Sequence, residues 1–222
     1  MIEKSKQTVG LQLSYIELSS IAVTIVGGSV LCVIVHDRAD GEEFGRLLAG
    51  ETLAAFMASH ARELAAGKGG AVAHSSFQDF QFRLGQVIRD TARPVLEQLK
   101  RNRAVVLALL VREDTGHARA GDSSIVHATG EVDQFGVLAN LKPLTSAASD
   151  VMALRVDAAQ SVWLESSPTR ASRLLVHRVA PATFLIVQFS KRFDFAHYRE
   201  DVARATRLLE KVSLHADMIT KR

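Results

Sequence analysis

The sequence predicts an α/β fold of the α+β kind, in which helices flank a mostly antiparallel five-stranded sheet. Two patterns carry this prediction: short aliphatic runs joined by tight turns, and longer segments whose apolar residues recur every three or four positions. The composition agrees, because 47% of the 222 residues are hydrophobic and 23% are charged, which is the balance of a folded chain. Only 6% are aromatic, so the core is expected to consist of Val, Leu, Ile and Ala.

Residues 1–70 are expected to form an extra, incomplete strand–strand–helix unit. Residues 21–35, IAVTIVGGSVLCVIV, predict two strands joined by a tight turn at Gly27-Gly28. This run is too short to span a bilayer. From residue 42 to 64 the apolar residues recur at helical spacing and predict an amphipathic helix. The small and polar residues 71–76 are expected to be a linker.

Residues 77–222 are expected to form the complete domain, in the order helix, two strands, helix, three strands, helix. Residues 104–111, AVVLALLV, predict a central strand that is covered on both faces. Pro94 falls inside a helical pattern and predicts a kink there or two abutting helices, and Pro143 predicts an interruption of the helical segment 132–154. The last helix is expected to start after Asp194, a favourable N-cap residue. The remaining strands are expected at 124–128, 162–165, 174–179 and 183–189.

A weak internal repeat relates the two parts of the chain. Residues 26–35, VGGSVLCVIV, match residues 179–188, VAPATFLIVQ, at an offset of 153, and the helices that follow match at the same offset. Two ordinary hairpin–helix units would give the same pattern, so a true duplication and a coincidence both stay open. An incomplete copy would expose a sheet edge and an apolar face, to be covered by the second copy, a second chain or another partner.

Three segments of the larger domain carry a family resemblance: AVVLALLV (104–111) with SIVHATG (124–130), VDQFGVLANLKPLTSAASDVMA (132–153), and LLVHRVAPATFLIVQFSKRFDFAHYREDVARATRLL (174–209). In this order they resemble the roadblock dynein-light-chain superfamily and, more distantly, the longin domains. The N-terminal unit resembles the second half of such a domain. The long loop at 113–123 departs from the tight turn usual in the family.

The resemblance implies a non-catalytic scaffold. Proteins of this superfamily pair through sheet edges and helices, and they often bind or regulate small GTPases or attach cargo to motors. No motif of the chain contradicts this expectation. The fragments Ile25-Val-Gly-Gly28 and Gly121-Asp-Ser123 are similar to parts of a trypsin-like protease but lack its remaining residues. The histidines show no metal-binding spacing. We expect no catalytic, cofactor-binding or metal-binding residues.

Charge and cysteine content limit the partners and the compartment. A net charge of +3, from 27 basic and 24 acidic side chains, does not indicate a nucleic-acid partner. The single cysteine, Cys32, excludes an internal disulfide and fits a reducing compartment, and its place in an aliphatic strand predicts an inert thiol. We expect no transmembrane segment and a cytoplasmic location.

These observations lead us to expect an interaction or scaffold subunit of a larger complex, linked to small-GTPase regulation. Its expected partner is a homologous roadblock- or longin-like subunit, or a second copy of the chain. A motor- or cilium-associated scaffold, a longin-type membrane-trafficking adaptor and a small α/β enzyme stay open as alternatives. The apolar residues expected to contact the partner are Leu47, Leu48, Phe56, Phe80, Leu84 and Leu138. A basic surface for a phosphate group or an acidic partner is expected at Arg199, Arg204, Arg207 and Lys211.

Overall fold

The computed structural model describes residues 14–27, 30–66, 74–113, 123–130, 137–154, 161–165, 173–190 and 195–220. It divides the chain into two compact units. The N-terminal unit comprises Met1–Thr91 with Met218–Arg222, and the C-terminal unit comprises Ala92–Asp217. Residues 77–91, expected in the larger domain, therefore belong to the N-terminal unit. The cause is aromatic packing: the ring of Phe80 meets the ring of Phe56 edge-on, at a centroid separation of 5.2 Å.

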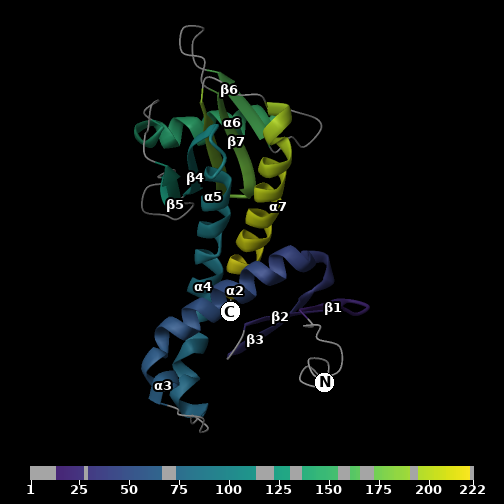
Figure 1. The fold of residues 1–222 in the computed structure, drawn as a ribbon. Coiled ribbons are helices and arrows are strands. Elements are labelled where there is room, and N and C mark those ends of the chain that lie inside the picture. Colours follow the sequence, from purple (N-terminus) through teal and green to yellow (C-terminus); the bar gives the residue numbers. More distant parts are fainter. Residues whose placement is uncertain are drawn as a thin grey trace. The chain divides into compact units, whose positions relative to one another are not determined.

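The N-terminal unit is a three-stranded antiparallel sheet with a long helix across one face (Figure 1). The strands are β1 (Tyr15–Glu17), β2 (Ile21–Gly27) and β3 (Leu31–Asp37), in the order β1-β2-β3. The helical elements are η1 (Arg38–Asp40), α2 (Gly41–Ser59), α3 (Ala61–Ala66), η2 (His74–Arg83) and α4 (Leu84–Asp90). The hairpin expected from residues 21–35 is confirmed. Part of its turn, residues 28 and 29, lies outside the described residues, as do residues 71–73 of the expected linker.

Helix α2 covers the sheet at very close range because of one glycine. Gly45 is buried beneath β2 and β3, where a Cβ atom would overlap His36 Nε2 and Thr24 Oγ1. Those two atoms are joined by a buried 3.0 Å hydrogen bond, and His36 Nδ1 lies 2.9 Å from the backbone oxygen of Asp37. The backbone of α2 can approach this polar pair only at a residue without a side chain.

The helix expected over residues 42–64 is two helices. His60 leaves the helical conformation, with φ −119° and ψ 25°, and separates α2 from α3. The backbone N–H of His60 still donates to the carbonyl oxygen of Phe56, so the chain bends without losing that hydrogen bond. Sequence spacing alone could not find this bend because the apolar pattern continues through it.

The C-terminal unit is built on a five-stranded antiparallel sheet in the order β5-β4-β8-β7-β6. Its strands are β4 (Val105–Glu113), β5 (Ser123–Gly130), β6 (Ser161–Glu165), β7 (Arg173–Ala180) and β8 (Thr183–Phe189). Its helical elements are α5 (Ala92–Lys100), η3 (Leu138–Asn140), α6 (Leu141–Ala153) and α7 (Phe195–Thr220, which runs past the limit of the unit). The expected order of helices and strands is confirmed, as is the expected α+β class with a mostly antiparallel five-stranded sheet flanked by helices.

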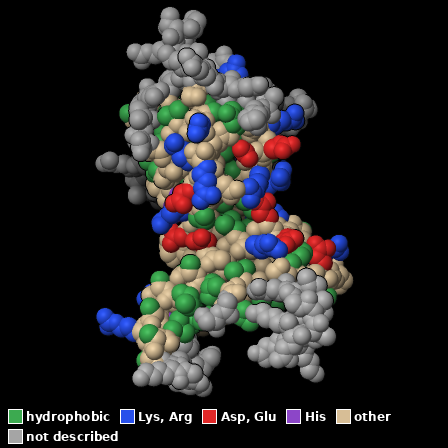
Figure 2. All heavy atoms as spheres, viewed as in Figure 1, with side chains coloured by type: hydrophobic (Ala, Val, Ile, Leu, Met, Phe, Trp, Pro, Cys, Tyr) green, Lys and Arg blue, Asp and Glu red, His purple; other side chains and the backbone are tan. Residues whose placement is uncertain are grey.

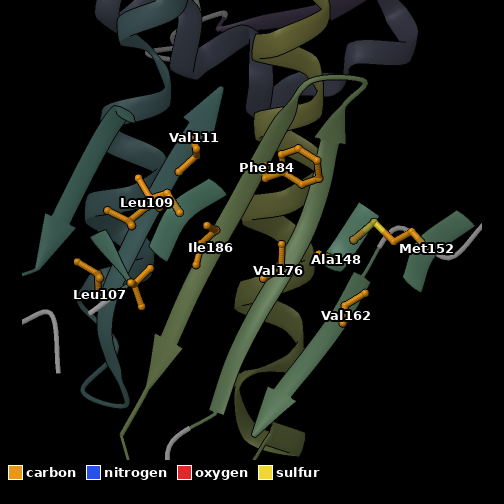
Figure 3. Close-up of a cluster of buried hydrophobic side chains, with 11 residues drawn as sticks. Leu107, Leu109, Val111, Ala148, Met152, Val162, Val176, Phe184 and Ile186 are labelled. Atoms are coloured by element: carbon orange, nitrogen blue, oxygen red, sulfur yellow. The ribbon is translucent and has the colours of Figure 1, made fainter. Parts of the chain in front are cut away.

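Helices cover both faces of this sheet. On one face, the side chains of β4, β7 and β8 are buried under α6, and Figure 3 shows Ala148 and Met152 of α6 among them. On the other face, α5 packs against β4 and β5, and α7 passes behind the strands in Figure 3. Leu109 of β4 and Leu185 of β8 are completely buried. The sequence prediction of a doubly covered strand at 104–111 is therefore correct.

The first helical region is two abutting helices, α4 and α5, as expected, but neither Pro94 nor Pro143 is the point at which a helix breaks. Pro94 is the third residue of α5, and Pro143 is the third residue of α6. The first four N–H groups of a helix have no partner within it, so a proline there costs no hydrogen bond. The break in the first helical region comes earlier, at Thr91, whose N–H and hydroxyl both donate to the carbonyl oxygen of Val87, at 2.9 and 2.8 Å.

Candidate interaction surfaces

Helix α6 has two apolar sides. Its inward side chains, which include Ala148 and Met152, are buried against the sheet. A second line of residues at spacings of four, four and three is exposed. We call this line the outer stripe of α6, and it consists of Pro143, Ala147, Val151 and Leu154. Val151 is 39% exposed and Leu154 is 83% exposed, so the stripe presents aliphatic surface to solvent.

The sequence analysis named none of these four residues as partner contacts. Their spacing is visible in the printed sequence, but the small residues of the segment fit several helix faces. It named Leu138 instead, whose side chain lies outside the described residues.

Among the described residues, strand β6 lies at the edge of the five-stranded sheet and pairs with β7 alone. Val162 lies on the α6 face and is buried, while Trp163 points to the opposite face. There the Trp163 ring lies 5.7 Å from the ring of Phe189, and 38% of the residue is exposed. The free backbone groups of an edge strand are a template for another strand, so β6 and the outer stripe of α6 are two features suited to contact with another chain.

A polar cluster joins the edge strand to the last helix. Ser161 Oγ of β6 lies 2.6 Å from His177 Nδ1 of β7, and His177 Nε2 lies 3.3 Å from Glu210 Oε1 of α7. His177 is buried. Burial lowers the pKa of His177, and the nearby Glu210 opposes this effect. A neutral imidazole protonated at Nε2 satisfies both contacts, accepting from the serine hydroxyl and donating to the carboxylate.

Hydrogen bonds that run in this direction, from serine to histidine and from histidine to a carboxylate, also allow a histidine to activate a serine nucleophile. Catalysis would also require oxyanion donors and room for a substrate. The contacts of the cluster connect β6, β7 and α7, so we assign it a structural role. Sequence reasoning missed it because the three residues come from distant segments with no motif spacing.

The residues expected to contact a partner have different environments. Leu48 is buried in the core of the N-terminal unit, and Leu47, Phe56 and Phe80 are half-buried. Leu84 is exposed at the start of α4. Phe56 and Phe80 contact one another, and α2 packs against α4, so these side chains first serve the packing of the unit itself. Their contact with a partner stays a prediction.

The expected basic residues lie on one helix, α7. Arg199 and Arg207 are exposed, and Arg204 and Lys211 are half-buried. A groove on this helix is lined by Arg199, Arg204 and Arg207, but also by Glu200 and Asp201. Figure 2 likewise shows Lys and Arg side chains beside Asp and Glu side chains on the face it presents. The surface is of mixed charge, and binding of an anionic partner there stays a prediction.

Several further expectations concern single residues. Cys32 is a free, half-buried thiol, and burial raises its pKa, which disfavours the reactive thiolate. Within the described ranges, no group of three His, Cys, Asp or Glu side chains is placed to hold a metal ion. None of the helices in the described part of the chain has the length and apolar character needed to cross a membrane.

Comparison with known proteins finds likeness in structure. No family model matches the chain, and no curated protein matches it. Among solved structures, MglB of Myxococcus xanthus is 12% identical, with 60% of this chain and 91% of that chain covered and a TM-score of 0.43. The gliding protein MglB of Thermus thermophilus is 19% identical, with 58% and 92% covered and a TM-score of 0.44. A Roadblock/LC7 domain from Streptomyces avermitilis is 17% identical, with 55% and 93% covered and a TM-score of 0.36.

Proposed function

We propose that this chain is a non-catalytic interaction subunit that pairs, through the outer stripe of α6 and the edge strand β6, with a homologous roadblock-like subunit or a second copy of itself. The observation that carries the proposal is the exposed aliphatic stripe on a helix whose other side is already buried. Val151 and Leu154 lie on this stripe, and neither contributes to the core beneath α6. Burial of apolar area against a partner is the main favourable term in association.

Strand β6 complements this stripe. Its outer edge can receive a strand from the partner, which would extend the five-stranded sheet by main-chain hydrogen bonds. Trp163 lies on this strand, and aromatic residues are enriched where partners bury surface. The pairing uses backbone and aliphatic groups, so it requires no cofactor or metal.

We further propose that the assembled subunit regulates a small GTPase. This step rests on the family resemblance of the segments 104–130, 132–153 and 174–209. The alternatives, a motor- or cilium-associated scaffold and a longin-type membrane-trafficking adaptor, follow from the same resemblance and use the same pairing surfaces. They differ only in the partner, so the partner decides among them.

The pairing is tested by sedimentation of the purified full chain at micromolar concentration, alone and with its co-purifying subunit. V151K and L154K place a charge on the outer stripe and should abolish pairing. The matched control is L214K, at an exposed leucine of α7 that lies on neither surface. The fluorescence of Trp163, the single tryptophan, should shift to shorter wavelength on pairing. A chain that stays monomeric and recovers no roadblock-like subunit would refute the proposal.

The GTPase step has its own test. The purified complex is mixed with candidate small GTPases loaded with GDP or with a non-hydrolysable GTP analogue. Binding in one nucleotide state supports regulation. Equal binding in both states, or recovery of dynein or tubulin components instead, would favour the scaffold alternative. V151K and L154K separate the two steps, because they break pairing without changing the rest of the chain.

A further inference from the structure

One face of the N-terminal sheet exposes several large apolar side chains. Side chains alternate across a strand, and the register of β2 and β3 places Thr24 and His36 on the side of α2. The alternate residues point away from α2. We call them the open face, and they are Ile16, Ile21, Val23, Ile25, Leu31, Val33 and Val35.

Apart from Gly27 and Asp37 at the ends of its rows, the open face is aliphatic. Ile25 is buried, but Val33 is 52% exposed and Val35 is 60% exposed, with Ile21 and Leu31 at 40% and 44%. The solvent side of an antiparallel sheet is ordinarily polar. Here all four of the exposed side chains are apolar, and a contiguous exposed apolar patch marks an interaction site.

The C-terminal unit contains the equivalent face, and there it is covered. The order β2-β3-α2 corresponds to β7-β8-α7 at the offset of 153 residues found in the sequence. Val23 then corresponds to Val176. In the same way, Leu31 corresponds to Phe184 and Val33 to Ile186.

All three of these equivalents, Val176, Phe184 and Ile186, are at most 1% exposed, and they lie in the cluster beneath α6 (Figure 3). The open face therefore has the residues of a core face, but several of its side chains are exposed where their equivalents are covered by α6.

We propose that the open face binds an amphipathic helix from a partner protein. The occupant has the chemistry of the inward side of α6, an aliphatic stripe at spacings of three and four with a small residue at its centre, as in Leu141, Leu144, Ala148 and Met152. A helix about 10 Å wide covers three strands that lie ~4.8 Å apart. Its charged position, Asp37 at the end of β3, is exposed and accepts a hydrogen bond from the backbone N–H of Ala39, so an aliphatic stripe can bind the centre of the face without leaving a charged group buried and unpaired.

The equivalent face of the C-terminal unit favours a helix over a second copy of the sheet, because a helix, α6, covers it there. Helices that lay an apolar side into a complementary surface bind with a few anchoring side chains. This site lies on the N-terminal unit and does not depend on pairing through α6.

The test uses a fluorescein-labelled, helix-stapled peptide of residues 140–154 as the probe, because α6 covers the equivalent face. Fluorescence anisotropy measures its binding to the full chain and to three full-length variants. V33K and V35K should each weaken binding at least about tenfold, and L214K should leave it unchanged. A second peptide in which Leu144 and Met152 are replaced by serine should fail to bind.

The substituted positions are exposed, so the variants should fold, and circular dichroism checks this. Three outcomes would overturn the proposal: no saturable binding to the wild-type chain, binding to V33K and V35K that is as tight as to the wild-type chain, or a wild-type self-association that V35K abolishes and L214K does not. The third outcome would mean that the open face binds a second copy of this chain. Loss of pairing in V151K and L154K addresses the proposed function and leaves peptide binding to Val33 and Val35 unaffected, so the two failures can be told apart.

Discussion

The hydroxyl of Ser161 lies 2.6 Å from Nδ1 of His177, and the second ring nitrogen of His177 faces Glu210 at 3.3 Å. The imidazole thus connects the edge strand β6 to helix α7 through β7. Both contacts are satisfied by the neutral ring, and burial lowers the pKa of His177. The stability of the C-terminal unit should therefore depend on pH.

The expected dependence has a definite sign. The unfolded chain binds a proton at His177 near the ordinary histidine pKa of about 6.5, while the folded chain binds it only at lower pH. Stability should be constant above that value and should fall as the pH drops below it. Urea unfolding between pH 7.5 and 5 measures this loss. H177Q should lose less unfolding free energy than the wild-type chain over this pH range, and H215Q should lose as much as the wild-type chain. If the unfolding free energies of H177Q and the wild-type chain fall equally with pH, His177 is not the group responsible.

Gly45 and Gly50 should respond to alanine in opposite ways. Both lie in α2, but a Cβ at Gly45 overlaps His36 and Thr24, and a Cβ at Gly50 meets no atom within 4 Å. G45A should destabilise the N-terminal unit by about 1–3 kcal/mol through overpacking. G50A should stabilise it by about 0.5–1 kcal/mol through helix propensity. Thermal unfolding measures both, and a stabilising G45A would show that α2 does not approach the sheet this closely.

Replacement of Phe80 by alanine should lower the stability of the N-terminal unit, and replacement of Phe82 should not. Both lie on η2, but Phe80 packs edge-on against Phe56, and Phe82 is exposed. F80A should cost about 1–2 kcal/mol, less than the ~3–5 kcal/mol of a fully buried phenylalanine, and F82A should cost almost nothing. Hydrogen exchange of the amides of α2 reports the local effect. Equal protection in the two variants would argue against packing of η2 on α2.

Gln188 should be a site of stabilisation. It is 1% exposed, and among the described residues neither its Nε2 nor its Oε1 has a hydrogen-bond partner. Burying an unpaired amide costs about 1–3 kcal/mol, so Q188L should raise the stability of the C-terminal unit by a similar amount. At the repeat offset its equivalent is Val35, an aliphatic residue. Chemical denaturation gives the value; a destabilised Q188L would mean that the amide has a partner.

Local patterns allowed much of the fold to be predicted from the sequence. The continuous aliphatic runs of β4 and β8 and the helical spacing of α2 and α7 come from short-range periodicity. The bend at His60 and the helix break at Thr91 could not be predicted, because apolar spacing continues through both positions.

The interaction surfaces were harder to predict, for physical reasons. The aliphatic run 21–35 has no polar alternation, so it does not show which face is covered and which is open. The outer stripe of α6 contains small residues that fit either side of a helix. The contact between Ser161 and His177 depends on strand pairing, and no sequence spacing reports it.

The position of β8 in the middle of the five-stranded sheet has a consequence for synthesis on the ribosome. Strand β8 lies between β4 and β7 and pairs with both of them. The pair β5–β4 and the pair β6–β7 therefore cannot join into one sheet until the chain has been translated past Phe189. The β2–β3 hairpin and α2, whose contacts are local in sequence, can form well before that point. The nascent N-terminal unit would then present its aliphatic strands to chaperones and partners while the C-terminal sheet is still incomplete.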